Sequence, residues 1–261
     1  MDTAVGSGAE AEHGSRWPLV TAAGAAALYA GAGLTFVGRD LAGTALPALL
    51  VGTGLVATVA GLAGWTREAF LGGRPAGRGR EGVYTGGMVL FLVSDVATFL
   101  AGFVFYGFVR AGAWPPAELP PLLSSLVLAN TLVLVASSLT LHRGHRALEA
   151  GDDAGFRRWL AVTVLLGAVF VGGQALEYAE FLAEGFGFAG AFGTAFYGLT
   201  GLHGLHVALG VVLLALTLWR AVGGAFGPER DTGVRTVSLY WHFVDGVWLV
   251  LVATLYVGAA L

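Results

Sequence analysis

The sequence contains no cysteine and no lysine. Without cysteine the chain cannot form disulfides, iron–sulfur clusters, thiolate-ligated haem or a thiolate copper centre. Without lysine it cannot form a Schiff base, which excludes a retinal-binding protein. All fourteen basic residues are therefore arginine.

Charge is also scarce, since only 12% of the 261 residues are charged while 56% are hydrophobic. A water-soluble domain carries roughly 25% charged residues. The mean hydropathy of +0.75 and the 42 glycines point to a bundle of membrane helices, because small residues let such helices pack closely. The net charge of -3 indicates no particular partner, and no nucleic-acid partner is expected.

Apolar stretches long enough to cross about 30 Å of hydrocarbon predict an all-α integral membrane protein with seven spans. The spans are expected at 17–37, 46–64, 83–109, 121–141, 159–182, 191–219 and 237–260. The preceding residues 1–16 are polar, acidic and glycine-rich and lack the basic region of a secretory signal, so we expect a disordered tail.

The arginines predict the orientation, because basic residues remain on the cytoplasmic side of a membrane. With the N-terminus inside, only Arg39 and Arg110 lie outside, and the other twelve arginines lie inside. This asymmetry favours an odd number of spans, a cytoplasmic N-terminus and an external C-terminus in the cell membrane.

The glycine-rich loop at 72–80 superficially resembles a phosphate-binding turn. No strand precedes it and a membrane span follows, so nucleotide binding is not expected. We interpret 67–82 as a cytoplasmic linker between a two-helix unit at 17–66 and a five-helix unit at 83–261.

Three carboxylic acids fall within predicted spans: Asp95, Glu177 and Asp245. A charged acid at the bilayer centre costs at least about 2.5 kcal/mol, so each requires a partner, a cavity or a proton. Two interpretations stay open. These acids fix helix packing through hydrogen bonds, or they handle protons or contact lipid headgroups.

Three histidines also fall within spans: His203 and His206 share one helix face, and His242 lies in the last span. Axial ligation of haem would require histidines that face each other from different helices. Hydrogen bonding to Glu177 or Asp245 is the favoured alternative, because buried ionisable groups in lipid find one another.

These residues also allow two other classes of function. One is a stand-alone dihaem membrane cytochrome, and the other is a proton-coupled transporter that uses Asp95 and Asp245. The absence of an evident internal repeat counts against a transporter. His142 and His145 lie beside arginines at the inner boundary and are expected to form a solvated basic edge.

Six ordered segments resemble cytochrome c oxidase subunit III. They are 240–248 (YWHFVDGVW), 201–207 (GLHGLHV), 91–95 (FLVSD), 174–178 (QALEY), the run from Asn130 through Ser137-Ser138 to Glu149, Gly151 and Asp152, and Trp65 with Arg67-Glu68.

The resemblance implies an accessory subunit that carries no haem or copper and is not catalytic by itself. It belongs to an oxidase that reduces oxygen to water and pumps protons. The subunit binds subunit I directly, shares the complex with subunit II, and holds phospholipid in a cleft between the two-helix and five-helix units. In that family it supports proton uptake and protects the catalytic centre during turnover. The electron donor (a cytochrome, a copper protein or a quinol), the haem type and the pumping stoichiometry stay open.

Three residues match positions that this family associates with lipid: Trp65, Arg67 and Arg220. A guanidinium group at the membrane boundary suits phosphate binding. Two departures stand out. Asp95 replaces a usual glutamate, and the run Tyr84–Met88 lacks an arginine that is common there.

Overall fold

The computed structural model describes residues 16–37, 45–68, 81–112 and 121–260. Within these residues it contains seven α-helices long and apolar enough to span a membrane, and no strand. The predicted all-α fold with seven spans is therefore confirmed. The predicted tail at 1–16 falls, except for its last residue, outside the described residues, as does most of the predicted linker at 67–82.

The chain divides into two compact units, Met1–Gly77 and Arg78–Leu261. The first contains α1 (Trp17–Val37) and α3 (Ala45–Thr66). The second contains α4 (Glu81–Ala111), α5 (Ser125–Glu149), α6 (Asp153–Ala183), α7 (Gly190–Val222) and α8 (Thr232–Leu251). The lipid-filled cleft expected between the units stays a prediction.

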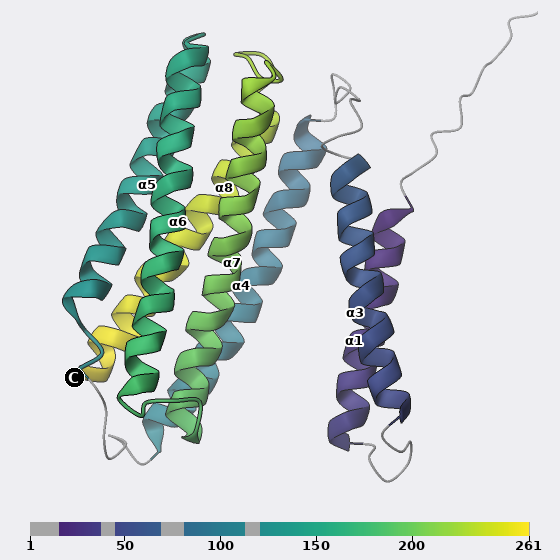
Figure 1. The fold of residues 1–261 in the computed structure, drawn as a ribbon, viewed down its shortest axis with the longest axis vertical. Helices are drawn as coiled ribbons and strands as arrows, with labels where there is room; N and C mark the ends of the chain where they lie inside the picture. Colours follow the sequence, from purple (N-terminus) through teal and green to yellow (C-terminus); the bar gives the residue numbers. More distant parts are fainter. Residues whose placement is uncertain (1–15, 38–44, 69–80, 113–120, 261) are drawn as a thin grey trace, which may run out of the picture. The chain divides into compact units, whose positions relative to one another are not determined.

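Helices α1 and α3 pack against each other through glycines (Figure 1). A Cβ atom added to Gly24 would lie 2.5 Å from the backbone nitrogen of Thr58, and one added to Gly54 would lie 2.5 Å from that of Leu28. No real side chain tolerates such distances. The two backbones therefore approach each other as closely as glycine allows, as in other membrane helix pairs.

In the second unit, α8 contacts α4, α5 and α7, while α6 lies between α5 and α7. Figure 1 shows α8, in yellow, running obliquely behind α6 and α7. Its buried face carries Trp241 and Trp248, which have no exposed surface. Their indole nitrogens donate hydrogen bonds to Ser137 (2.9 Å) and Thr131 (3.0 Å) on α5. These bonds satisfy the polar end of each buried ring.

Several helices extend beyond the predicted spans. Helix α5 continues to Glu149, and α6 begins at Asp153. Hydropathy detects only the apolar portion of a helix, whereas the helix itself ends where capping groups satisfy its backbone. Ser124 accepts from Val127 N at the start of α5, and Asp152 accepts from Gly155 N at the start of α6.

Glycines with positive φ lie two residues after the ends of α5, α6 and α7, at Gly151 (76°), Gly185 (84°) and Gly224 (72°). In each case the next residue donates a hydrogen bond back to the last turn, as Asp152 N does to Ala147 O over 2.9 Å. Only glycine adopts this left-handed conformation without strain. These turns reverse the chain.

The last helix changes type near its end. Helix α8 passes at Leu251 into the π-helix η2 (Val252–Val257), followed by a short 3₁₀ turn, η3 (Gly258–Ala260). Helix α4 contacts this segment: Tyr106 donates to Thr254 O (3.0 Å) and Arg110 donates to Gly258 O (2.8 Å). A π-helix rotates the residues that follow relative to a regular α-helix, and π segments are frequent at functional sites.

Candidate functional site

The structure places the six predicted intramembrane acids and histidines in three separate groups. Asp95 and His206 meet between α4 and α7. Glu177 and His203 lie in the interior of α6, α7 and α8. His242 and Asp245 lie on α8 facing α5, next to Ser138.

In the first group, His206 Nε2 lies 3.4 Å from Asp95 Oδ2, and both side chains are mostly buried. The other ring nitrogen, Nδ1, lies 2.8 Å from Leu202 O. A carbonyl oxygen only accepts, so Nδ1 carries a proton. Nε2 is then the ring nitrogen that faces Asp95. The contact is close but lacks the alignment of a hydrogen bond, since Asp95 Oδ2 has none among the described residues.

Aromatic rings enclose this pair. The Phe99 ring centroid lies 5.3 Å from that of His206, and the Tyr240 ring stacks on His206 with centroids 6.5 Å apart. Tyr240 also donates a hydrogen bond to the backbone oxygen of His206 over 2.9 Å. The aromatic surroundings lower the local dielectric, which strengthens the attraction between Asp95 and His206.

In the second group, Glu177 is almost completely buried on α6. Its Oε2 atom accepts hydrogen bonds from Gln174 Nε2, one turn earlier, and from the Tyr256 hydroxyl at 3.0 Å. Tyr256 belongs to η2 and has no exposed surface. Both donors are uncharged. A proton on the carboxyl group removes the cost of a buried charge at this position.

His203 is also fully buried, and its ring stacks on Trp248 with centroids 5.2 Å apart. Phe170 presents its ring edge-on to His203 at 6.0 Å. Neither ring nitrogen has a hydrogen-bond partner among the described residues. Among the residues that the structure describes, no histidine ring forms a hydrogen bond with Glu177 or Asp245.

The third group lies between α5 and α8. His242 Nδ1 is 3.2 Å from the Ser138 hydroxyl, which also interacts with the Asp245 carboxyl group. His242 is exposed at the surface of the unit, while Asp245 is half-buried. His206 thus faces α4 and His242 faces α5, so these two histidines do not oppose each other across one site, as haem ligands would.

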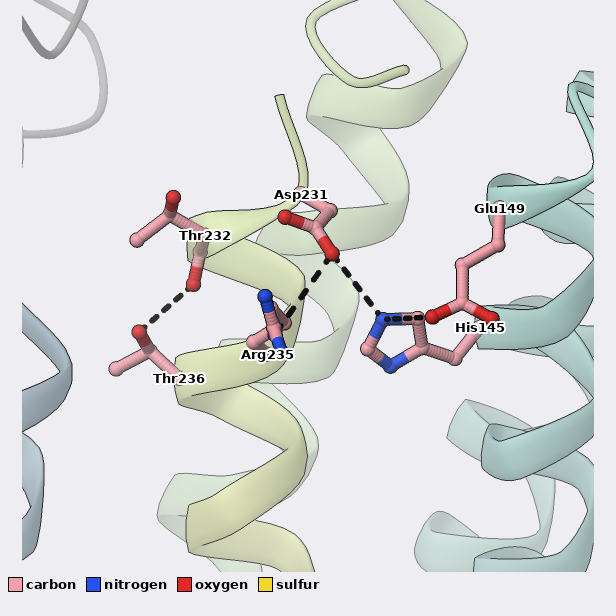
Figure 2. A network of polar contacts seen from close by, with 6 residues as sticks. All are labelled: His145, Glu149, Asp231, Thr232, Arg235 and Thr236. Carbon is pink, nitrogen blue, oxygen red and sulfur yellow. Dashed lines mark hydrogen bonds and ion pairs between the residues drawn. The ribbon is translucent and has the colours of Figure 1, made fainter. Parts of the chain in front are cut away.

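A further polar cluster joins the end of α5 to the start of α8 (Figure 2). Asp231 Oδ2 lies 3.4 Å from His145 Nε2 and 3.8 Å from Arg235 Nε, and the same histidine nitrogen lies 3.7 Å from Glu149 Oε1. The expectation that His145 belongs to a solvated edge is wrong, because its side chain is only 20% exposed and paired; the neighbouring His142 is exposed.

The sequence did not single out Asp231 or Tyr256. Asp231 stands directly before α8, where a helix-capping residue is expected. This position in the sequence could have marked it as a structural residue. Tyr256 lies in an apolar run, and nothing local indicates that it reaches Glu177.

The predicted lipid-binding residues lie in both units. Trp65 is half exposed near the end of α3, and Arg67 follows that helix and is exposed. Arg220 lies in the last turn of α7, with its guanidinium carbon 5.3 Å from the Phe226 ring centroid. Each of these side chains lies at or just beyond the end of a helix.

Among the described residues there is no group of three or more histidine, aspartate or glutamate side chains arranged to hold a metal ion. The intramembrane acids and histidines instead contact other polar side chains or the backbone, except His203, whose ring stacks on Trp248. The class is thus defined: a multi-pass helical membrane protein whose few intramembrane acids and histidines lie between helices in separate small groups.

Comparison with known proteins identifies the family. The family model described as cytochrome c oxidase subunit III matches residues 12–260, and the chain belongs to this family. A cytochrome c oxidase subunit 3 from Synechocystis is 40% identical over 173 residues, which cover 65% of this chain and 73% of the relative. A probable subunit 3 from Nocardia farcinica is 42% identical over 181 residues, covering 68% and 89%.

A third relative, cytochrome c oxidase subunit 3 of Scyliorhinus canicula, is 37% identical over 256 residues. This match covers 93% of the chain and 94% of the relative, so it includes both units. The resemblance inferred from the six sequence segments is therefore confirmed. The chain is a multi-pass membrane protein of the haem-copper oxidase subunit III family.

Proposed function

We propose that this chain is the accessory subunit of a haem-copper terminal oxidase, carries no redox group, and stabilises subunit I of that complex. The observation that carries the proposal is the family match across both units. The separation of the buried acids and histidines into small groups supports it, because such groups brace helices against one another.

The test of this assignment is co-purification from membranes in mild detergent. Tagged chain is expected to bring down a larger, haem-containing multi-span protein together with subunit II, and the oxidase activity should decay faster during turnover once this chain is removed. If the chain elutes alone from membranes that retain oxidase activity, the proposal fails. A haem absorption band on the separated chain would instead favour the dihaem cytochrome.

The second element of the proposal is phospholipid binding at Trp65, Arg67 and Arg220. Arginine binds phosphate through two parallel hydrogen bonds, and the half-exposed Trp65 ring suits the membrane interface. Native mass spectrometry should detect fewer retained phospholipids after Arg220→Ala or Arg67→Ala. The matched control is Arg157→Ala, another arginine at the inner ends of the helices. Equal lipid retention in all three variants would refute this element.

The third element is the orientation, with the N-terminus in the cytoplasm and the C-terminus outside. The arginine distribution supports it. Because the native chain has no cysteine, single cysteines introduced by Ser7→Cys and Leu261→Cys report each end separately. An impermeant thiol reagent added to intact cells should label only the C-terminal cysteine. Labelling of the N-terminal one instead would reverse the orientation.

A further inference from the structure

The interior of α6, α7 and α8 contains more polar atoms than the described side chains satisfy. Three side chains contribute: His203 through both ring nitrogens, Gln174 through Oε1 and Glu177 through Oε1. All three are at least 95% buried. Buried polar atoms without a partner are costly, and native proteins satisfy nearly all of them with protein groups or ordered water.

Two contacts place these side chains at neighbouring levels. The Tyr178 hydroxyl on α6 lies 2.6 Å from the Thr200 hydroxyl on α7, and this pair sets the register of the two antiparallel helices. One turn along each helix from that pair brings Gln174 level with His203. Phe170, a further turn along α6, also contacts the His203 ring, with centroids 6.0 Å apart.

Trp248 connects His203 to the group around Glu177. Its ring lies 5.2 Å from that of His203 and 5.8 Å from that of Tyr256, which donates to Glu177. His203, Gln174 and Glu177, together with Tyr256, therefore occupy a single region of the interior. Phe170 and Trp248 form its apolar walls.

The chemistry of the unpaired atoms specifies what this region binds. Gln174 Oε1 is an acceptor, and a neutral imidazole offers one donor and one acceptor. The described partners of Glu177 are uncharged. A ligand that complements this set must be small, neutral and able both to donate and to accept hydrogen bonds. Water has these properties, and buried waters typically make about three such bonds.

We propose that α6, α7 and α8 enclose a water-binding site formed by His203, Gln174 and Glu177. The bound water completes a hydrogen-bonded chain that runs from His203 through the water and Gln174 to Glu177 and Tyr256. This chain joins the middle of α7 to the π-helix at the end of α8. The site is separate from the Asp95–His206 pair and from the lipid-binding residues, and it goes beyond the accessory role proposed above.

The first test is solid-state NMR on the full chain in phospholipid bilayers, with ¹⁵N-labelled histidine and ¹³C-labelled tryptophan. The His203 ring is recognised by its contact with Trp248. Magnetisation transferred from water protons should reach a His203 ring nitrogen, and Gln174→Leu should remove that signal. No transfer from water to His203, or a direct contact between its ring and the Gln174 amide, would overturn the proposal.

The second test is a double-mutant cycle that uses His203→Phe and Gln174→Leu, with the SDS-induced unfolding midpoint of the chain in mixed micelles as readout. Each single variant leaves the other group without its water, so each should lower the midpoint. The double variant should lower it by less than the sum of the two. The control pair His203→Phe with Ser94→Ala should be additive, because the Ser94 hydroxyl donates to Phe91 O within its own helix, α4. Additive effects in the first pair would contradict a shared water.

Both tests use the chain without partner subunits, so their outcome is independent of the co-purification result. The NMR measurement on the unsubstituted chain also stands if a variant fails to fold.

Discussion

Tyr256 donates a hydrogen bond to Glu177 over 3.0 Å, although 79 residues separate them in the chain. The bond joins the π-helix at the end of α8 to the last third of α6, both in the interior of the five-helix unit. The buried Glu177 carboxyl group has one hydrogen-bond donor on its own helix, Gln174. Tyr256 supplies a second donor from another part of the chain. The end of the chain therefore contributes to the polar interior.

Replacement of Tyr256 by phenylalanine should destabilise the five-helix unit by about 1–3 kcal/mol, because it removes a buried donor and leaves Glu177 Oε2 with one partner. The measurement is unfolding in SDS monitored by circular dichroism. Tyr29→Phe is the control, since Tyr29 is 76% exposed on α1. Equal stability of the two variants would contradict the importance of the bond.

Trp248→Phe should cost about 1–3 kcal/mol of unfolding free energy. It removes the indole donor to Thr131 and leaves a small cavity beside His203 and Phe170. The same change at Trp219, which is 57% exposed on α7, should have little effect. The comparison holds the substitution constant and varies only burial, so similar losses at both positions would refute the packing argument.

Gly54→Val should disrupt the close contact of α1 with α3, because a side chain at this position meets the backbone of Leu28. We expect a loss of about 1–3 kcal/mol, typical of overpacking. Hydrogen–deuterium exchange of peptides from α1 and α3 is the measurement. Gly52→Val on the same helix is the matched control, since nothing lies within 4 Å of a Cβ atom there. Faster exchange in both variants would indicate a loss of helix propensity instead.

Asp95→Asn should shorten the active lifetime of the assembled oxidase and leave initial turnover mostly intact. Asparagine cannot carry a negative charge, so the contact with His206 loses its ionic character and the packing of α4 against α7 weakens without loss of a catalytic group. The measurement is oxygen consumption against time, with Ser94→Ala as the neighbouring control. Immediate loss of all activity in Asp95→Asn would point to failed assembly.

Asp231→Asn should lower stability by at most about 1 kcal/mol, and the loss should shrink as salt is added. Arg235 is 65% exposed, so its attraction to Asp231 is screened, while His145 contributes the more buried contact. The unfolding midpoints of both proteins at two ionic strengths give the measurement. A large, salt-independent loss would show that Asp231 acts as a buried group.

The sequence predicted the spans well because hydropathy is a local property. Its span boundaries were less accurate. The predicted fourth span ended at Leu141, but α5 continues to Glu149 because an interfacial helix persists beyond the hydrocarbon. This extension places His145 on the helix, opposite Asp231, and accounts for the error about its exposure.

The candidate site was predicted only as a set of residues. Membrane burial makes Asp95, Glu177, His203 and His206 conspicuous in an apolar sequence, so composition alone identifies them. Their pairing follows from helix register and packing. His203 and His206 share a helix and lie three residues apart, yet one stacks on Trp248 in the interior while the other faces Asp95 on α4.

The sequence by itself determined that the chain is a membrane protein, how many spans it has and to which family it belongs. Each of these properties follows from apolar runs or from motifs of a few residues. The tertiary structure alone decided that Tyr256 reaches Glu177, that Trp241 bonds to Ser137 and that Asp231 joins His145 to Arg235. Most of these contacts join residues tens of positions apart. They depend on which face each helix turns toward its neighbours, and side-chain packing fixes that rotation only when the helices assemble.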